Sequence, residues 1–285
     1  MSMPEIFRVR WSNPGAPVKI TGGQAMRMAD MICDERHKIT FDKLGFVVIP
    51  GFFPVETIRV VSDWLDALQQ QPPGPAPEAR YFERSSITGE PLLVRVEYIL
   101  GDHNPEITRL LLTNDVRASL TTLLGEPPVL FKEKVNYKVP GSRPDKLHQD
   151  QAAGWNAYTN FFVTLCIVID ENRRDNAALS FLGNGKFPRA LMGPEWKPLT
   201  DQDPPYQPEE DYTLVVAQPG DAIFFNSFIP HGSPANRSSA CRRNIYLTFN
   251  GQSAGDHRDR YYQDKWRTYP PNRLEEARAE TSYRV

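Results

Sequence analysis

His148 and Asp150 stand two positions apart in the stretch DKLHQDQAAGW, just ahead of a long apolar run. Successive side chains of a strand point to opposite faces, so a His-x-Asp pair at a strand end directs both side chains into one cavity. An imidazole nitrogen and a carboxylate oxygen suit Fe(II), but the same pair also occurs as two ordinary polar residues. A third ligand from elsewhere in the chain would distinguish the two interpretations.

His231 is the candidate for that third ligand. It ends the apolar run FFNSFIPHGS, 83 residues after His148, which leaves room for intervening strands. The other histidines, His37, His103 and His257, lie among charged residues and are interpreted as solvated. Two histidines and one carboxylate form the facial triad of non-haem iron oxygenases, which leaves three coordination positions open.

A possible carboxylate-binding pair follows His231 in the chain. Ser233 comes two residues later, and Arg242 comes 11 residues later, at the start of the apolar run RRNIYLTF. The planar fork of a guanidinium matches a carboxylate, and a hydroxyl adds one more donor. A 2-oxo acid bound to iron through its C1 carboxylate and keto oxygen would present its far carboxylate to this pair. The alternative is that Arg242 and Arg243 are two surface arginines.

Further side chains could line a substrate pocket. Alternation along one predicted strand puts two lysines on one face, and an arginine shares a face with Glu97 in an earlier β-rich segment. Two aromatic residues follow the His-x-Asp pair and could form a lid or a wall. The candidates are Arg95, Lys132, Lys134, Trp155 and Tyr158. Cations indicate an anionic group on the substrate, whereas the alternative is a solvated strand edge beside an aromatic core.

The elements that must position these residues change character near residue 128. Before it, helices are predicted over 24–37 and 54–71 and twice within 104–125, with β-rich segments at 46–53 and 91–100. After it, the pattern favours short strands separated by glycine and proline turns, at 129–138, 146–149, 161–170, 178–182, 212–217, 222–226 and 244–250. We therefore expect a mainly β fold, a double-stranded β-helix (jelly roll) flanked by N-terminal helices.

We expect one domain over residues 1–285, with a helical part to about 125, a jelly-roll core over about 126–252 and an extension over 253–285. A net charge of -2 gives no reason to expect nucleic acid or an anionic membrane as partner. No apolar run approaches the roughly 18 residues of a membrane span, and no signal pattern opens the chain, so a cytoplasmic location is expected. The three cysteines form no C-x-x-C pair, which argues against structural zinc and disulfides.

Several segments together resemble the phytanoyl-CoA dioxygenase superfamily of Fe(II)/2-oxoglutarate oxygenases. They are His148–Asp150, RRDNAALSFLGNGK (173–186), QPGDAIFFNSFIPHGS (218–233) and Arg242, within a match over roughly 131–250. The resemblance implies iron at His148, Asp150 and His231, and the 2-oxoglutarate carboxylate at Arg242 and Ser233. The run EKVNYK is similar to the family strand ahead of the His-x-Asp, which implies contact of Asn136 with 2-oxoglutarate.

A narrower resemblance concerns the substrate. KEKVNYKVPG, HQDQAAGW and YYQDKWRTYPPN are similar to a bacterial subgroup of 2-aminoethylphosphonate dioxygenase-like proteins. The turn LGNGK (182–186) departs from the family pattern near the pocket entrance, which bears on the substrate and not on iron binding. The family also implies O₂ as co-substrate, and succinate and CO₂ as products. Related halogenases have a small residue at the position of Asp150, so the resemblance implies hydroxylation, desaturation or ring chemistry here.

Other functions stay open at this point. The substrate is a small molecule, either a small polar anion such as an aminophosphonate or a larger apolar intermediate of natural-product tailoring. A jelly-roll protein that binds metal without turnover is the alternative from another class, and a zinc hydrolase is a third that would give Arg242 no role. An oligomer is compatible with all of them.

Overall fold

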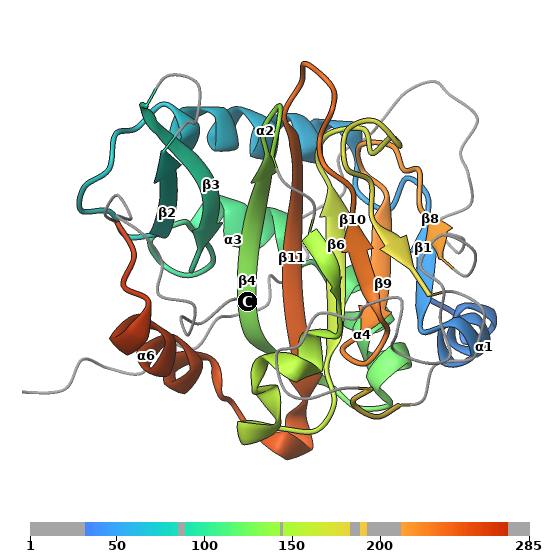
Figure 1. The fold of residues 1–285 in the computed structure, drawn as a ribbon. Coiled ribbons are helices and arrows are strands. Elements are labelled where there is room, and N and C mark those ends of the chain that lie inside the picture. Colours follow the sequence, from blue (N-terminus) through green and yellow to red (C-terminus); the bar gives the residue numbers. More distant parts are fainter. Residues whose placement is uncertain (1–31, 85–88, 143–144, 183–188, 193–211, 273–285) are drawn as a thin grey trace, which may run out of the picture.

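The computed structural model describes residues 32–84, 89–142, 145–182, 189–192 and 212–272. In these ranges the chain forms two antiparallel sheets, one with the strand order β1-β9-β6-β11-β4-β3-β2 and one with the order β5-β10-β7-β8 (Figure 1). The mainly β, jelly-roll fold expected from the strand periodicity is thereby confirmed. The division of residues 1–285 into a single domain with three parts stays a prediction.

The larger sheet brings together segments from both halves of the chain. Its strands are β1 (Phe46–Ile49), β2 (Ala79–Arg84), β3 (Pro91–Glu97), β4 (Pro128–Lys138), β6 (Val163–Val168), β9 (Ala222–Asn226) and β11 (Arg242–Gly251). Strand β11 pairs with both β4 and β6, and all ten of its residues are buried. A central strand covered on both faces must position its functional side chains inside the protein.

The smaller sheet carries the histidines of the sequence motif. It consists of β5 (Asp145–His148), β7 (Ser180–Phe181), β8 (Thr213–Leu214) and β10 (His231–Ser233). A hydrophobic cluster joins it to the larger sheet, with Phe181 and Ile229 packed among Cys166, Phe225 and Tyr246. The two sheets therefore enclose the space into which the inward-facing side chains of β10 and β11 point.

In the described part of the chain four helices precede strand β4, and their ends follow local chemistry. They are α1 (Glu35–Leu44), α2 (Val55–Gln69), α3 (Pro105–Leu111) and α4 (Asn114–Leu124). Asp34 and His37 form a capping box at the start of α1, and Thr113 caps α4. Both helices end at a glycine with positive φ, Gly45 and Gly125.

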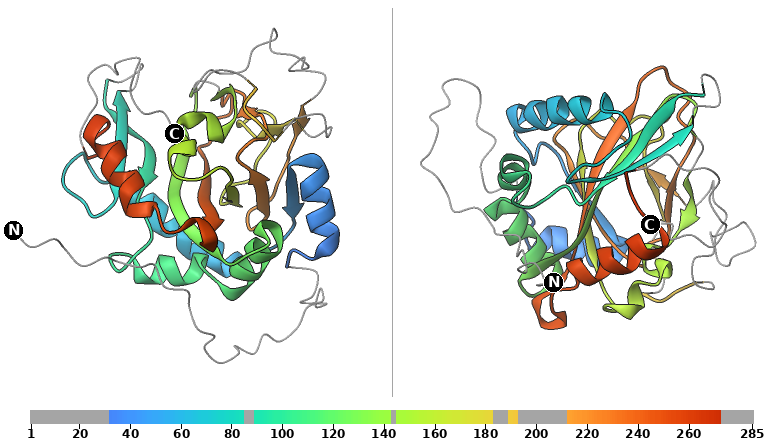
Figure 2. Two further views of the ribbon diagram at one scale, coloured as in Figure 1. Left: turned by 90° about the horizontal axis from the view of Figure 1, so that it is seen from below. Right: turned by 90° about the vertical axis from the view of Figure 1, so that its left-hand side faces the viewer.

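Helices α2 to α4 cover the outer face of the larger sheet (Figure 2). The apolar face of α2, with Ile58, Val61, Leu65 and Leu68 at helical spacing, enters the same core as the sheet residues Val135 and Leu247. This core leaves the opposite face of the sheet for the polar residues of the site.

The structure corrects some of the sequence expectations, and others fall on residues that it does not describe. The helix predicted over 24–37 begins at Glu35, because Asp34 supplies its cap, and residues 24–31 lie outside the described ranges. Strand β2 and the C-terminal helix α6 (Arg258–Thr268) were not expected at all. The LGNGK turn, 182–186, lies outside the described residues beyond Leu182.

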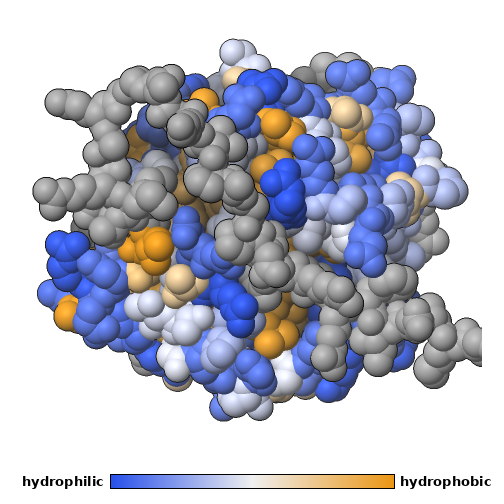
Figure 3. Space-filling view, turned by 180° about the vertical axis from the view of Figure 1, so that it is seen from behind, coloured by the Kyte–Doolittle hydropathy of each residue, from blue (hydrophilic) through white to orange (hydrophobic). Residues whose placement is uncertain are grey.

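The described surface is mainly polar. From behind, hydrophobic side chains form small separate patches among hydrophilic ones (Figure 3). In the parts of the chain that the structure describes, every helix is too short or too polar to cross a bilayer.

Candidate active site

His148, Asp150 and His231 converge, as their spacing predicted. One ligand atom from each lies within 4.8 Å of the other two. Asp150 Oδ1 is 3.6 Å from His148 Nε2 and 3.8 Å from His231 Nε2, beyond hydrogen-bond distance. The buried Oδ1 atom has no hydrogen-bond partner. An orphaned carboxylate oxygen between two imidazole nitrogens fits a metal ion, and this donor set suits Fe(II).

The smaller sheet aligns the two histidines. Strands β5 and β10 pair so that His148 stands opposite His231. The His231 Nδ1 atom lies 3.0 Å from the Ile229 carbonyl oxygen. With its proton on Nδ1 for this bond, the imidazole directs the lone pair of Nε2 towards the space beside Asp150.

Asp150 lies just past the strand end that the sequence predicted. It is the first residue of a 3₁₀ turn, η2 (Asp150–Ala153), which directly follows β5 and Gln149. Gln149 is structural: its Nε2 donates to the carbonyls of Phe228 and Ala190, and its Oε1 accepts from the Met192 amide. This amide bridge fixes the chain between the two ligands of the His-x-Asp motif.

The electrostatics of the three residues favour an anion flanked by neutral imidazole. Burial alone would raise the pKa of Asp150, but His231, His148 and Lys134 hold it below its usual range. Burial and the neighbouring His148 lower the pKa of His231 to about 4. A neutral imidazole and an ionised carboxylate are the protonation states that a metal requires.

Arg242 and Arg243 lie on opposite faces of β11, and both are buried, so neither is a surface arginine. Arg243 points to the helices, where it binds Asp170 through Nε and Nη2 and Asp66 through Nη1. Arg242 points inward. Its Nη2 donates to the Ala177 carbonyl, and its buried Nε has no hydrogen-bond partner.

Ser233 lies on β10, and Asn136 lies on β4, the strand that pairs with the strand of Arg242. Ser233 is buried on β10, two residues from His231, and its hydroxyl donates to Asp145 at 3.1 Å. The Asp145 carboxylate interacts electrostatically with Arg242. Arg242 of β11 stands opposite Lys138 of β4. Asn136 is half-buried and pairs across the larger sheet with Asn244, two residues from Arg242 on the same face.

Three cationic side chains lie along β3 and β4 and point to the same inward face. Lys132 is buried and Lys134 half-buried, with Lys134 Nζ 5.2 Å from the Tyr246 ring centroid. Arg95 stands opposite Asn136, and its Nη1 lies 3.6 Å from Glu97 Oε1. The predicted alternation along these strands is confirmed, and it places cations of two neighbouring strands on the face of the site.

The family model described as phytanoyl-CoA dioxygenase (PhyH) matches residues 41–244, well over half of the chain. The chain belongs to the phytanoyl-CoA dioxygenase family. A 2-aminoethylphosphonate dioxygenase of the uncultured bacterium HF130_AEPn_1 is 32% identical over 83% of this chain and 89% of its own. A methylphosphonate hydroxylase of Gimesia maris is also 32% identical, over 80% of this chain and 85% of its own.

The fold is also similar to that of a solved structure. The crystal structure of EctD from S. alaskensis with 2-oxoglutarate and 5-hydroxyectoine superimposes with a TM-score of 0.67 at 18% identity, over 86% of each chain. Together with the His-Asp-His cluster, these likenesses make the protein an Fe(II)- and 2-oxoglutarate-dependent dioxygenase that acts on a small molecule.

The two aromatic candidates of this dioxygenase take different places. Trp155 is buried, packs edge-to-face on Phe131 and Phe162, and lies under the ammonium group of Lys132. Tyr158 packs on Phe131 but is bound outward, where its hydroxyl donates to Asp264 of α6 at 2.9 Å. Trp155 thus belongs to a buried aromatic cluster, whereas Tyr158 contacts the C-terminal helix.

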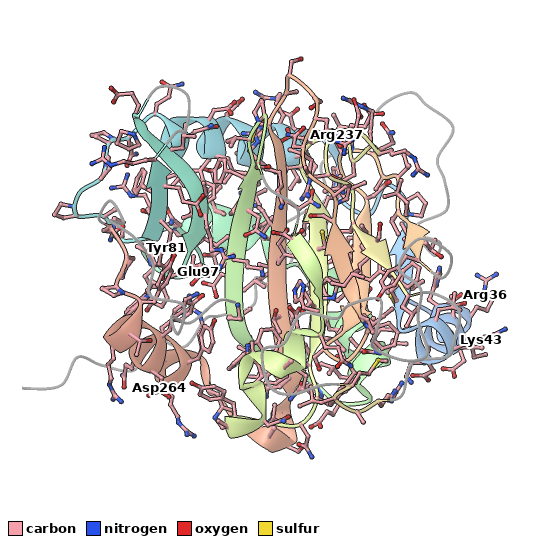
Figure 4. All side chains as sticks on the ribbon, in the orientation of Figure 1. Arg36, Lys43, Tyr81, Glu97, Arg237 and Asp264 are labelled. Atoms are coloured by element: carbon pink, nitrogen blue, oxygen red, sulfur yellow. The ribbon has the colours of Figure 1, made fainter. Side chains whose placement is uncertain are left out.

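Sequence reasoning missed the contribution of α6. Lys265 Nζ donates to both carboxylate oxygens of Glu97 at 2.6 Å, and Arg258 binds the buried Glu133. Glu97 lies where the β2–β3 hairpin approaches α6. Figure 4 labels Glu97 and, on the helix, Asp264. The available signal was the helical spacing of Tyr261, Lys265 and Tyr269 in YYQDKWRTY.

Opposite charges set the protonation of this pair. Burial would raise the pKa of Glu97, but Lys265, Lys132 and Arg95 lower it to about 2. Burial lowers the pKa of Lys265 to about 8, against the opposing effect of Glu97. The carboxylate is therefore ionised at neutral pH.

Proposed function

We propose that this dioxygenase hydroxylates a small organophosphonate, such as an aminophosphonate. The proposal includes iron at His148, Asp150 and His231, and 2-oxoglutarate at Arg242, Ser233 and Asn136. The observation that carries it is the accumulation of cations inside the protein beside the His-Asp-His cluster. The two relatives whose printed names include a phosphonate add support.

The metal assignment rests on the chemistry of three atoms. The Nε2 atoms of His148 and His231 and the orphaned Oδ1 of Asp150 provide two nitrogens and one oxygen. Bound iron with 2-oxoglutarate and O₂ supplies the oxidation, in which 2-oxoglutarate, O₂ and R–H become succinate, CO₂ and R–OH. The β5–β10 pairing holds the two histidines, the turn η2 positions Asp150, and the neighbouring charges keep Asp150 ionised.

The 2-oxoglutarate assignment rests on the unfilled donor of Arg242. Its Nε is buried without a partner, so a carboxylate at this position would complete its hydrogen bonds. When this carboxylate binds, the Ser233 hydroxyl turns from Asp145 to donate to it, and Asn136 adds a side-chain amide from β4. The two groups orient the distal carboxylate so that the opposite end of the molecule faces the ligands.

The substrate assignment rests on charge and size. Lys132, Lys134 and Arg95 face the interior, and only Glu97 of the described carboxylates interacts with all three. A substrate with a doubly charged head group would neutralise this excess. The aromatic residues Trp155, Phe131 and Phe162 pack on one another. This packing favours a small substrate over the larger apolar intermediate.

The cysteines and the ferrous site bear on the cellular compartment of the protein. The three cysteines are free, and Cys33 and Cys166 are buried. Free thiols and a ferrous site are compatible with a reducing cytoplasm, which we propose as the location.

The test is succinate formation by purified enzyme with Fe(II), ascorbate, 2-oxoglutarate and O₂. We expect 2-aminoethylphosphonate or methylphosphonate to raise succinate production well above the substrate-free rate, with an equal amount of hydroxylated phosphonate. The matched control is 3-aminopropionate, the carboxylate analogue of the first substrate. No phosphonate-dependent succinate, or equal stimulation by the carboxylate, would refute the proposed substrate class.

A further inference from the structure

Lys132 is a buried lysine whose amino group has no hydrogen-bond partner among the residues that the structure describes. Its side chain is 1% exposed, and none of its three donors is satisfied. The Nε1 donor of Trp155 is equally buried and unsatisfied, and the Lys132 Nζ atom lies 5.2 Å from the Trp155 ring. Since buried polar groups are almost always paired, two orphaned donors side by side indicate acceptor atoms of a ligand.

The neighbourhood offers Lys132 no free counter-charge. Burial, together with the charges of Lys134, Lys265 and Arg95, lowers the pKa of Lys132 well below its usual range, and Glu97 opposes this shift. Both oxygens of Glu97 already accept from Lys265 at 2.6 Å. The ammonium form of Lys132 therefore requires a counter-anion beyond the engaged carboxylate of Glu97.

The adjacent acidic residues are also engaged. Glu133 follows Lys132 in β4 but points to the other face, where it binds Arg258 and the Leu100 amide. Asp145 lies 2.9 Å from Lys138, further along the strand. Within the described ranges, none of these carboxylates forms a hydrogen bond or ion pair with Lys132.

Packing alone does not account for this lysine. Its ammonium group lies 5.2 Å from the centroids of the Trp155 and Tyr261 rings. Cation–π contacts of this kind contribute about 2 kcal/mol when desolvated, less than the several kcal/mol that removing an ammonium from water costs. A methionine would fill the same apolar space without that cost, so the retained charge requires another reason.

We propose that Lys132 Nζ and Trp155 Nε1 form an internal subsite for a tetrahedral oxyanion, distinct from the 2-oxoglutarate carboxylate site at Arg242, and that it holds the phosphonate group of the substrate. The inference rests on the proposed function and names its specificity residues. A phosphonate offers three oxygens to the ammonium and the indole N–H, and its charge offsets the local excess of cations.

The subsite also lies suitably for oxidation of a neighbouring carbon. Lys134 is two residues from Lys132 on the same face of β4, and its charge interacts with Asp150. Trp155 follows Asp150 by five residues through the turns η2 and η3 (Trp155–Ala157). Both arms of the subsite therefore belong to chain segments that also carry Asp150 or a side chain that interacts with it.

The experiment measures methylphosphonate binding by calorimetry to anaerobic enzyme loaded with Fe(II) and saturating 2-oxoglutarate. In Lys132→Met we expect a rise in the dissociation constant of about 10- to 100-fold, the loss of charge-assisted hydrogen bonds. Trp155→Phe, which keeps the aromatic wall, should raise it about 3- to 10-fold. Lys43→Met, at an exposed position on α1 (Figure 4), controls for loss of a distant charge and should change nothing.

Further readouts separate a subsite from a structural role. Lys132→Met should retain the wild-type KM for 2-oxoglutarate and unfold at the same temperature or a higher one, because it removes an unpaired buried charge. A lower melting temperature with unchanged methylphosphonate affinity would make Lys132 a packing residue and overturn the inference. Competition between methylphosphonate and 2-oxoglutarate, or no binding to the wild type, would overturn it as well.

Failure of the proposed function would look different. If the wild type binds methylphosphonate through Lys132 but no phosphonate stimulates succinate formation, the oxyanion subsite stands and the phosphonate substrate is refuted. If phosphonates are hydroxylated and Lys132→Met has wild-type affinity and kcat/KM, the function stands and the subsite is refuted.

Discussion

Exchange of Arg242 for methionine tests the 2-oxoglutarate site, and its neighbour provides a matched control. Arg242 and Arg243 are adjacent buried arginines of β11 that point to opposite faces of the larger sheet. Arg243 has carboxylate partners in Asp170 and Asp66, whereas the inward Arg242 donates to the Ala177 carbonyl and retains an unsatisfied Nε. The same substitution should therefore impair binding at one position and stability at the other.

The magnitudes follow from these contacts. A hydrogen bond to a charged group contributes about 1.5–3 kcal/mol, so Arg242→Met should raise the KM for 2-oxoglutarate about 10- to 150-fold. Its free energy of unfolding should change by only about 1 kcal/mol, because loss of the Ala177 contact is offset by removal of a buried charge. Arg243→Met leaves Asp170 and Asp66 without their partner and should cost about 2–4 kcal/mol, reduced because both carboxylates are partly exposed.

The assay measures succinate against 2-oxoglutarate concentration at saturating prime substrate, alongside urea unfolding of each variant. Arg243→Met should keep the wild-type KM for 2-oxoglutarate under conditions in which it is folded. An unchanged KM in Arg242→Met, or an equal rise in both variants, would remove Arg242 from the proposed carboxylate site.

Three further predictions concern the ligands, the sheet that aligns the histidines and the ion pair between Glu97 and helix α6. Asp150→Ala should lose stoichiometric iron, assayed with a chromogenic chelator, and all turnover; a fully active variant would exclude the triad. In Gly232→Ala the new Cβ would lie 2.8 Å from the Asp145 carbonyl oxygen, so β10 must shift from β5 and the iron dissociation constant should rise about 10-fold or more. The folded pKa of Glu97 is about 2 against an ordinary 4.5, so its ionisation stabilises the fold fully above pH 4.5 and this stabilisation is lost as the pH falls towards 2. Glu97→Gln should flatten that loss in urea unfolding between pH 5 and about 2.5, and an unchanged slope would contradict the shifted pKa.

Much of the site could be predicted because it follows local rules. The alternation of a strand directs His148 and Asp150 to one side, and the same rule places Lys132 and Lys134 on one face. Strand β9 occupies the residues that its periodicity indicated, Ala222–Asn226. Other elements differed at their ends, where a cap such as Asp34 or a short turn such as η2 decided the boundary, and β2 and α6 were not predicted at all.

The sequence by itself determined the chemistry: two imidazoles, a carboxylate, an arginine and a set of lysines at spacings that strands bring together. Only the tertiary structure decided which of the charges have partners. Glu97 and Lys265 are 168 residues apart, and their pairing requires α6 to pack against the β2–β3 hairpin. Because a buried charge is stabilised by groups distant in the chain, no local pattern distinguishes the paired Arg243 from the inward Arg242, or the partnered Lys265 from the unpartnered Lys132.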